Sequence, residues 1–105
     1  MIRFMRSARS MHGKGGEAIM WATEVTDYLN NQYKEVKVSV FTSRFGSMNT
    51  IYWHADVADL AALDHWQKQI GSDRGYRDMR RKAVHLFVQD SIQDLVLSSV
   101  SVTET

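Results

Sequence analysis

Three side chains with acid–base or hydrogen-bonding chemistry alternate along one short segment of the sequence. Tyr52, His54 and Asp56 stand at positions i, i+2 and i+4, so a β-strand would project all of them from one face. Histidine titrates near neutrality, and a neighbouring carboxylate favours its use as a general base. We therefore predict His54 and Tyr52 as catalytic residues, with Tyr52 positioning a phenolic substrate. The alternative is that His54 only forms a hydrogen bond at a dimer interface.

A single arginine interrupts an apolar strand face near the N-terminus. Ile2, Phe4 and Ala8 fall on one side of a strand over residues 2–9, and Arg6 falls on the same side. A buried guanidinium needs an anionic partner, which is either a carboxylate of the protein or an anionic ligand.

Aromatic side chains supply the other part of a binding site. Pockets for small molecules are mostly apolar and carry few directing polar groups. Trp53 and Trp66 suit such a lining, with Arg6 as the directing group. We therefore predict Arg6, Trp53 and Trp66 as substrate-binding residues for a small aromatic or anionic ligand. The same aromatic side chains are also consistent with a filled core.

The sequence carries no pattern typical of a metal or cofactor site. The histidines show neither H-x-x-x-H nor H-E-x-x-H spacing, and there is no cysteine, so we predict no metal and no cofactor. Haem ligation by His85 stays open, because haem needs an axial ligand such as histidine. The glycine-rich loop at residues 12–16 could offer its amides to an anion. It lacks the P-loop and G-x-G-x-x-G patterns, which favours an ordinary connection.

The spacing of apolar residues predicts the elements that position these side chains. Period-two alternation indicates strands, and apolar residues three or four apart indicate helices. Asp59 is expected to cap the second helix, which residues 71–73 interrupt. The expected elements are a strand at 2–9, a helix at 17–33, a strand at 36–41, a turn at 45–49, a strand at 51–57, a helix at 60–70, a further helical stretch that reaches residue 87, and a strand at 94–102.

The order β-α-β-β-α-β predicts an α+β, ferredoxin-like fold that forms a single domain over residues 1–105. Right-handed crossovers place both helices on one face of a four-stranded antiparallel sheet. The other face carries Phe41 and Tyr52, and we assign Met5 and Val96 to it as well. A wholly solvated sheet face is seldom this apolar. We therefore predict a homodimer in which this face packs against the same face of a second copy.

With this element order, the sequence resembles the dimeric α/β-barrel superfamily, which includes antibiotic-biosynthesis-type monooxygenases, EthD-like proteins and NIPSNAP proteins. The resemblance covers about residues 2–100. It also rests on a strand that runs into an acid-initiated helix at 50–64 and on the broken helix at 66–77. It implies a dimeric α/β barrel and a cofactor-independent oxygenase, or a related enzyme, for aromatic or polyketide-like substrates. The superfamily shares no catalytic signature, so the resemblance transfers no residue role.

Composition bears on partners and location. The chain of 105 residues has a formal charge of +1, which argues against nucleic acid and against a membrane surface as partners. Arg74, Arg77 and Arg81 share one helical face, which we interpret as solvated. No apolar run approaches the roughly 20 residues of a spanning helix. The N-terminus begins with a strand-like segment instead of a signal peptide, so we expect a cytoplasmic protein.

The sequence leaves the activity undetermined and favours two functions. The first is small-molecule binding, or cofactor-independent oxygenase-like catalysis, in a pocket between the sheet and the helices. The alternative is a non-enzymatic homodimeric binding or interaction protein of the same fold. A tightly filled interior, with no room for a substrate, would favour the alternative.

Overall fold

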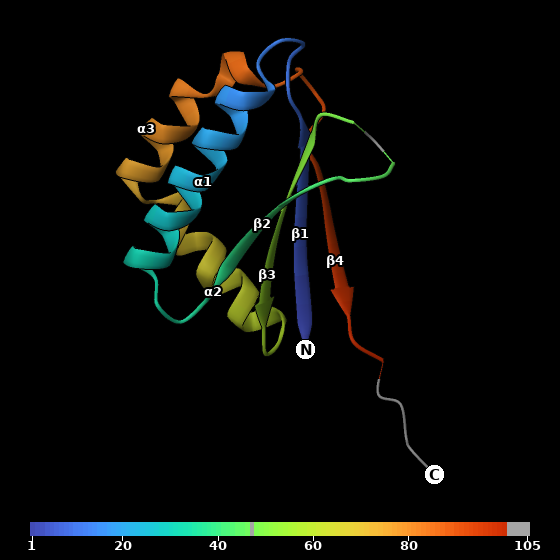
Figure 1. Cartoon of the computed structure of the whole chain (residues 1–105). Coiled ribbons are helices and arrows are strands. Elements are labelled where there is room, and N and C mark those ends of the chain that lie inside the picture. The colour runs from blue at the N-terminus through green and yellow to red at the C-terminus, as the bar shows by residue number, and fades with distance from the viewer. Residues whose placement is uncertain (47, 101–105) are drawn as a thin grey trace.

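The computed structural model of the chain describes residues 1–46 and 48–100. Within them, strands and helices follow one another in the expected order (Figure 1). The elements are β1 (Ile2–Arg9), α1 (Gly15–Gln32), β2 (Val38–Thr42), β3 (Thr50–Val57), α2 (Leu60–Gly71), α3 (Arg74–Lys82), a 3₁₀ helix η1 (Val84–Leu86) and β4 (Gln93–Ser98).

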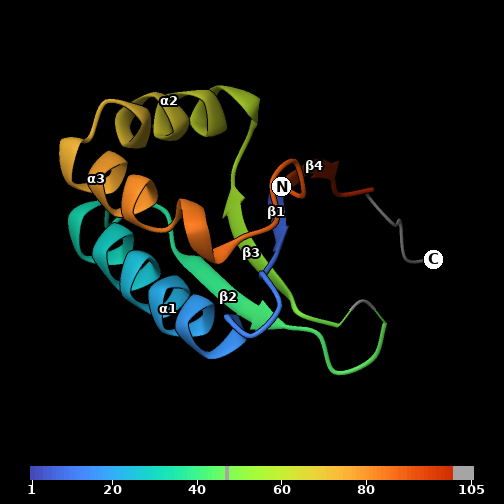
Figure 2. The same cartoon turned by 90° about the horizontal axis from the view of Figure 1, so that it is seen from above.

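The strands of the described residues form one antiparallel sheet in the order β2-β3-β1-β4. Two perpendicular views show the helices on one side of this sheet and its other side open (Figure 1, Figure 2). We call these sides the helix face and the open face. The predicted α+β, ferredoxin-like arrangement of a single chain is therefore confirmed.

The strand register decides which side chains lie on the helix face. Arg6 pairs with Trp53, and Phe4 pairs with Ala55. Directly paired residues project from the same face of an antiparallel sheet. Phe4 and Ala55 are buried, so Arg6 and Trp53 share the helix face with them. Tyr52, the neighbour of Trp53 on β3, projects from the open face.

α1 and α2 cover the sheet with the apolar stripes that the sequence predicts, at helical spacings of three and four. The buried residues of α1 are Ala18, Ala22, Val25, Thr26 and Leu29. Those of α2 are Leu63, Trp66 and Ile70. The predicted cap is also confirmed, since the Asp59 carboxylate accepts a hydrogen bond from the backbone N–H of Ala62 at 2.8 Å.

Several elements begin or end at residues other than the expected ones. α1 starts at Gly15, inside the expected loop, because only Gly13 of that loop has a left-handed backbone conformation (φ 80°). α3 ends at Lys82, and η1 replaces the continuation that we expected. β4 ends at Ser98, and the last residues of the expected strand, 101 and 102, lie outside the described residues.

The connection between β2 and β3 falls where the sequence predicts, at residues 45–49, although Ser47 lies outside the described residues. β2 begins at Val38 and not at Val36. The turn uses left-handed backbone conformations that suit glycine and asparagine, at Gly46 (φ 101°) and Asn49 (φ 61°).

The assignment of Val96 to the open face is wrong. Val96 pairs with Phe4 and therefore projects from the helix face. Leu95 and Leu97 take the open face instead. In a strand, a shift of one residue exchanges the two faces, and the residue pattern of β4 does not by itself fix that register.

The carboxylate of Asp73 fixes the N-terminus of α3. It accepts hydrogen bonds from the hydroxyls of Tyr28 (2.7 Å) and Tyr33 (2.5 Å) and from the backbone N–H of Tyr76 (2.9 Å). Burial raises the pKa of Asp73, but these hydrogen bonds outweigh it and hold the pKa below its ordinary value. The hydrogen bond to Asp73 also raises the pKa of Tyr33 to about 12. Asp73 thus ties α3 to the C-terminal half of α1.

We predict that Asp73→Asn lowers the free energy of unfolding by about 1–2 kcal/mol at neutral pH, since hydrogen bonds to a charged group contribute this much after solvent screening. The folded-state pKa of Asp73 lies below its unfolded value of about 3.9. The stabilisation by the Asp73 carboxylate is therefore fully present above the unfolded-state pKa and is lost as the pH falls through the folded-state pKa. Denaturant unfolding of both proteins between about pH 2 and pH 8 measures the difference.

Asp64→Asn is the control for this prediction, because it breaks only the exposed ion pair with Lys68. We expect it to change the unfolding free energy by less than about 0.5 kcal/mol. If Asp73→Asn lowers the free energy of unfolding as much at acid pH as at neutral pH, the charge of Asp73 has no role in the stabilisation.

Because Gly75 has no side chain, there is room for the hydroxyl of Tyr28 to reach the carboxylate of Asp73. A Cβ atom at position 75 would clash with the hydroxyl oxygen of Tyr28 and lie 2.9 Å from its Cζ atom. We predict that Gly75→Ala destabilises the protein, although Gly→Ala within a helix usually stabilises by about 1 kcal/mol. The expected fall in the thermal midpoint is about 4–8 °C for each kcal/mol lost.

Gly16→Ala, in the first turn of α1, is the matched control, because no atom lies within 4 Å of its Cβ position. It should leave the midpoint unchanged or raise it. A midpoint for Gly75→Ala at or above that of the unmodified protein would show that Tyr28 moves away without cost.

Candidate functional site

A cavity of about 1320 Å³ lies between the helix face of the sheet and the helices. This exceeds the roughly 300–1,000 Å³ of most small-molecule pockets. Its wall combines residues of β1, β3, α1, α2 and α3 with the segment that leads to β4. Several wall residues, including Arg77 and Arg80, are exposed, so the cavity is open to solvent. Side chains therefore leave part of the space between the sheet and the helices open in the single chain.

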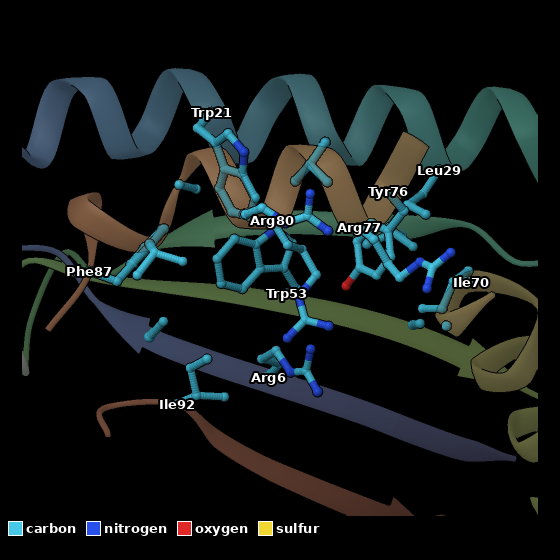
Figure 3. A pocket seen from close by; sticks show the side chains of 18 of the residues that line it. Arg6, Trp21, Leu29, Trp53, Ile70, Tyr76, Arg77, Arg80, Phe87 and Ile92 are labelled. Atoms are coloured by element: carbon cyan, nitrogen blue, oxygen red, sulfur yellow. The ribbon is translucent and has the colours of Figure 1, made fainter. Parts of the chain in front are cut away.

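One end of the cavity is aromatic. The ring centroid of Trp21 lies 6.2 Å from that of Trp53 and 5.5 Å from that of Phe87, and both pairs are edge to face. Trp53 and Phe87 are 6.3 Å apart. The indole N–H of Trp21 donates to the backbone carbonyl of Met79 at 2.9 Å, which fixes the cluster to α3. Trp21, Trp53 and Phe87 form what we call the aromatic wall (Figure 3).

Arg6 lies in the cavity wall, and its guanidinium pairs with a carboxylate of the protein. Its Nε and Nη2 atoms donate to the two carboxylate oxygens of Asp94 at 2.7 Å and 2.9 Å. This hydrogen-bonded pair raises the pKa of Arg6 and lowers that of Asp94. Of the two partners considered for Arg6, the structure shows the protein carboxylate. Arg6 also stands over the Phe4 ring, 5.6 Å from its centroid.

α3 turns basic side chains toward the cavity. The α3 residues that line it are Tyr76, Arg77, Arg80 and Arg81. Figure 3 shows Arg77 and Arg80 between this helix and the sheet, with Trp53 and Arg6 below them. Arg80 stands over the ring of Tyr76, 5.6 Å from the centroid. Its positive charge also contributes to the lowered pKa of Asp94.

Sequence reasoning missed this basic wall. It treated the arginines of α3 as a solvated face and did not single out Arg80. The available signal was the spacing of Arg77, Arg80 and Arg81 relative to Tyr76, which is the buried residue of α3. A helical wheel anchored on Tyr76 brings Arg77 and Arg80 to the sheet side.

The five predicted site residues separate into two groups. Arg6, Trp53 and Trp66 border the cavity, and Trp66 belongs to the core, with its ring 6.3 Å from that of Phe4. Tyr52 lies on the open face.

His54 is the remaining predicted residue. It borders the cavity between Trp53 and Ala55, but its ring lies 4.8 Å from that of Phe41 on the open face. The carboxylate of Asp56 accepts from Arg3 at 2.8 Å and 3.0 Å. Tyr52 and His54 therefore do not converge with Arg6 and Trp53.

Residues 1–46 and 48–100 contain no group of three or more histidine, aspartate or glutamate side chains that could hold a metal ion. None of the helices in this part of the chain is both long enough and apolar enough to cross a membrane.

No protein-family model matches the sequence, and no curated protein matches it. Several solved structures, however, share its fold. An uncharacterized NIPSNAP domain protein from Burkholderia xenovorans is 15% identical, with a TM-score of 0.82 over 100% of both chains. A NIPSNAP family protein from Agrobacterium tumefaciens is also 15% identical, with a TM-score of 0.78 over 94% of this chain and 92% of that chain.

A third structure, of an antibiotic biosynthesis monooxygenase, is 11% identical, with a TM-score of 0.71 over 96% of this chain and 100% of that chain. At these identities the likenesses show a common fold. They confirm, at the level of the fold, the resemblance expected from the sequence.

Proposed function

We propose that this protein binds a small organic molecule with a planar aromatic body in the cavity between sheet and helices. The observation that carries the proposal is the open cavity of about 1320 Å³ beside the aromatic wall. Aromatic pairs in edge or offset contact contribute about 0.5–1.5 kcal/mol beyond the burial of apolar area. The space in the interior favours this function over an interaction protein with a filled core.

Oxygenase-like catalysis on the bound molecule is a second candidate. It is supported by the likeness of the fold to that of an antibiotic biosynthesis monooxygenase. A reaction inside the cavity would take place beside Trp53 and the hydroxyl of Tyr76. The assignment of His54 and Tyr52 as catalytic residues remains a proposal, and it requires the reacting molecule to lie at the open face.

The proposal for the cavity is tested with 2-naphthamide, a neutral planar aromatic probe, by isothermal titration calorimetry. We expect binding to the unmodified protein and an affinity at least about 10-fold lower for Trp53→Ala, a loss of about 1.4 kcal/mol. Phe45→Ala is the control, because Phe45 is 95% exposed on the β2–β3 turn and does not line the cavity. Equal losses in the two variants, or no binding to the unmodified protein, would contradict the proposal.

We also propose that the open face packs against the same face of a second copy. Phe41, Leu95 and Leu97 on this face are 49%, 52% and 42% exposed. Like faces can then bury one another around a two-fold axis. At one end of this face Arg3 and Asp56 neutralise each other, so this pair would enter such an interface without uncompensated charge.

Size-exclusion chromatography with light scattering tests the dimer. We predict a dimer for the unmodified protein and a monomer for Leu95→Glu, because a carboxylate in an apolar interface is costly without a partner. Leu60→Glu is the matched control, since Leu60 is 62% exposed but lies on α2, away from the open face. An unmodified protein that runs as a monomer at roughly 100 µM, well above the dissociation constant of a stable complex, would rule out this interface.

A further inference from the structure

The apolar stripe of α3 is short: Tyr76 is buried, and Met79 is partly buried and packs against the core. A helix packed on a sheet usually buries apolar residues on its inner face. Among the residues of α3, Tyr76 is the buried one, and the other α3 residues in the cavity wall are Arg77, Arg80 and Arg81. The inner face of α3 therefore combines an apolar contact with the core and basic side chains that face the cavity.

The positive charge of the cavity wall is only partly neutralised within the described residues. Four arginines line the cavity, and Asp90 is the carboxylate that lines it with them. Arg6 is satisfied by Asp94, and Arg81 lies 3.6 Å from Asp78. In residues 1–46 and 48–100, no carboxylate lies within 4.0 Å of Arg77 or Arg80. An anion between these two guanidinium groups would relieve their mutual repulsion.

One contact orients the side chain of Arg80, and the cap of α3 sets the backbone position of both arginines. Arg80 rests over the Tyr76 ring at 5.6 Å, which orients its guanidinium by a cation–π interaction. The Asp73 carboxylate fixes the N-terminus of α3, one turn before Arg77. A site whose donors are already oriented loses less entropy when a ligand binds.

We infer that Arg77 and Arg80 form a carboxylate-binding subsite and that the ligand of the cavity is a planar aromatic carboxylic acid. This inference rests on the function proposed above and names the chemical class of its ligand. The carboxylate accepts hydrogen bonds from the two guanidinium groups, which match carboxylate geometry. The ring system extends to Trp53, which Figure 3 shows below the arginines, and from there to the rest of the aromatic wall. Arg6, already paired with Asp94, supports the floor of the site and does not bind the ligand's charge.

The test compares 2-naphthoate with 2-naphthamide, which have nearly the same shape and differ in charge. By calorimetry at low salt, we expect 2-naphthoate to bind at least about 10-fold more tightly than 2-naphthamide, which corresponds to 1.4 kcal/mol. Arg77→Gln and Arg80→Gln should each reduce the preference for 2-naphthoate, because each removes one of the two guanidinium groups, while the affinity for 2-naphthamide stays unchanged. That unchanged affinity also shows that the variants are folded.

Arg74→Gln is the matched control, because Arg74 lies on the same helix and does not line the cavity. It removes the same charge and should keep the preference for 2-naphthoate. Equal binding of both probes to the unmodified protein would overturn the inference and leave the proposed function standing. Failure of both probes to bind would overturn both. Tighter binding of 2-naphthyl phosphate than of 2-naphthoate, or an equal loss in Arg74→Gln, would overturn the carboxylate subsite.

Discussion

The carboxylate of Asp73 anchors the N-terminus of α3, the helix that forms one wall of the cavity. The inner face of α3 packs on the core through Tyr76 and Met79 but is otherwise basic, so further contacts are needed to hold the helix. Asp73 supplies them by joining the backbone of α3 to two tyrosine hydroxyls of the α1 segment. At the other end of α3, the indole N–H of Trp21 donates to Met79. Polar contacts at both ends thus hold α3 above the sheet without filling the space beneath it.

This arrangement explains why glycine stands at position 75. The side chain of Tyr28 occupies the volume that a Cβ atom would take. The first turn of α3 therefore gives up helix propensity, about 1 kcal/mol relative to alanine, for a hydrogen bond that sets the position of the whole helix. Local propensity and tertiary arrangement conflict at this residue, and such conflicts tend to mark functional regions.

The fold could be predicted from the sequence because its main signals are local. Alternating residues, helical spacing and the Asp59 cap each depend on near neighbours along the chain, and the order of elements then restricts the topology. Arg6 was recognisable for the same reason, as one charge on an apolar strand face. The sheet face from which Val96 projects could not be predicted in this way, because it depends on the register of β4 with β1. The contribution of Arg80 was hidden as well, since its position over the cavity depends on the long-range contacts of Asp73.

β4 has a further consequence for the charge of the cavity. All six of its residues are exposed in the single chain, and it lies at an edge of the sheet. Segments with few buried contacts open at lower free energy than the core does, in local unfolding events that hydrogen exchange detects. Each opening of β4 takes Asp94 away from Arg6 and adds a third unneutralised guanidinium to the cavity wall. The electrostatic potential of the cavity therefore fluctuates with the edge strand, and a partner that covers β4 would suppress this fluctuation.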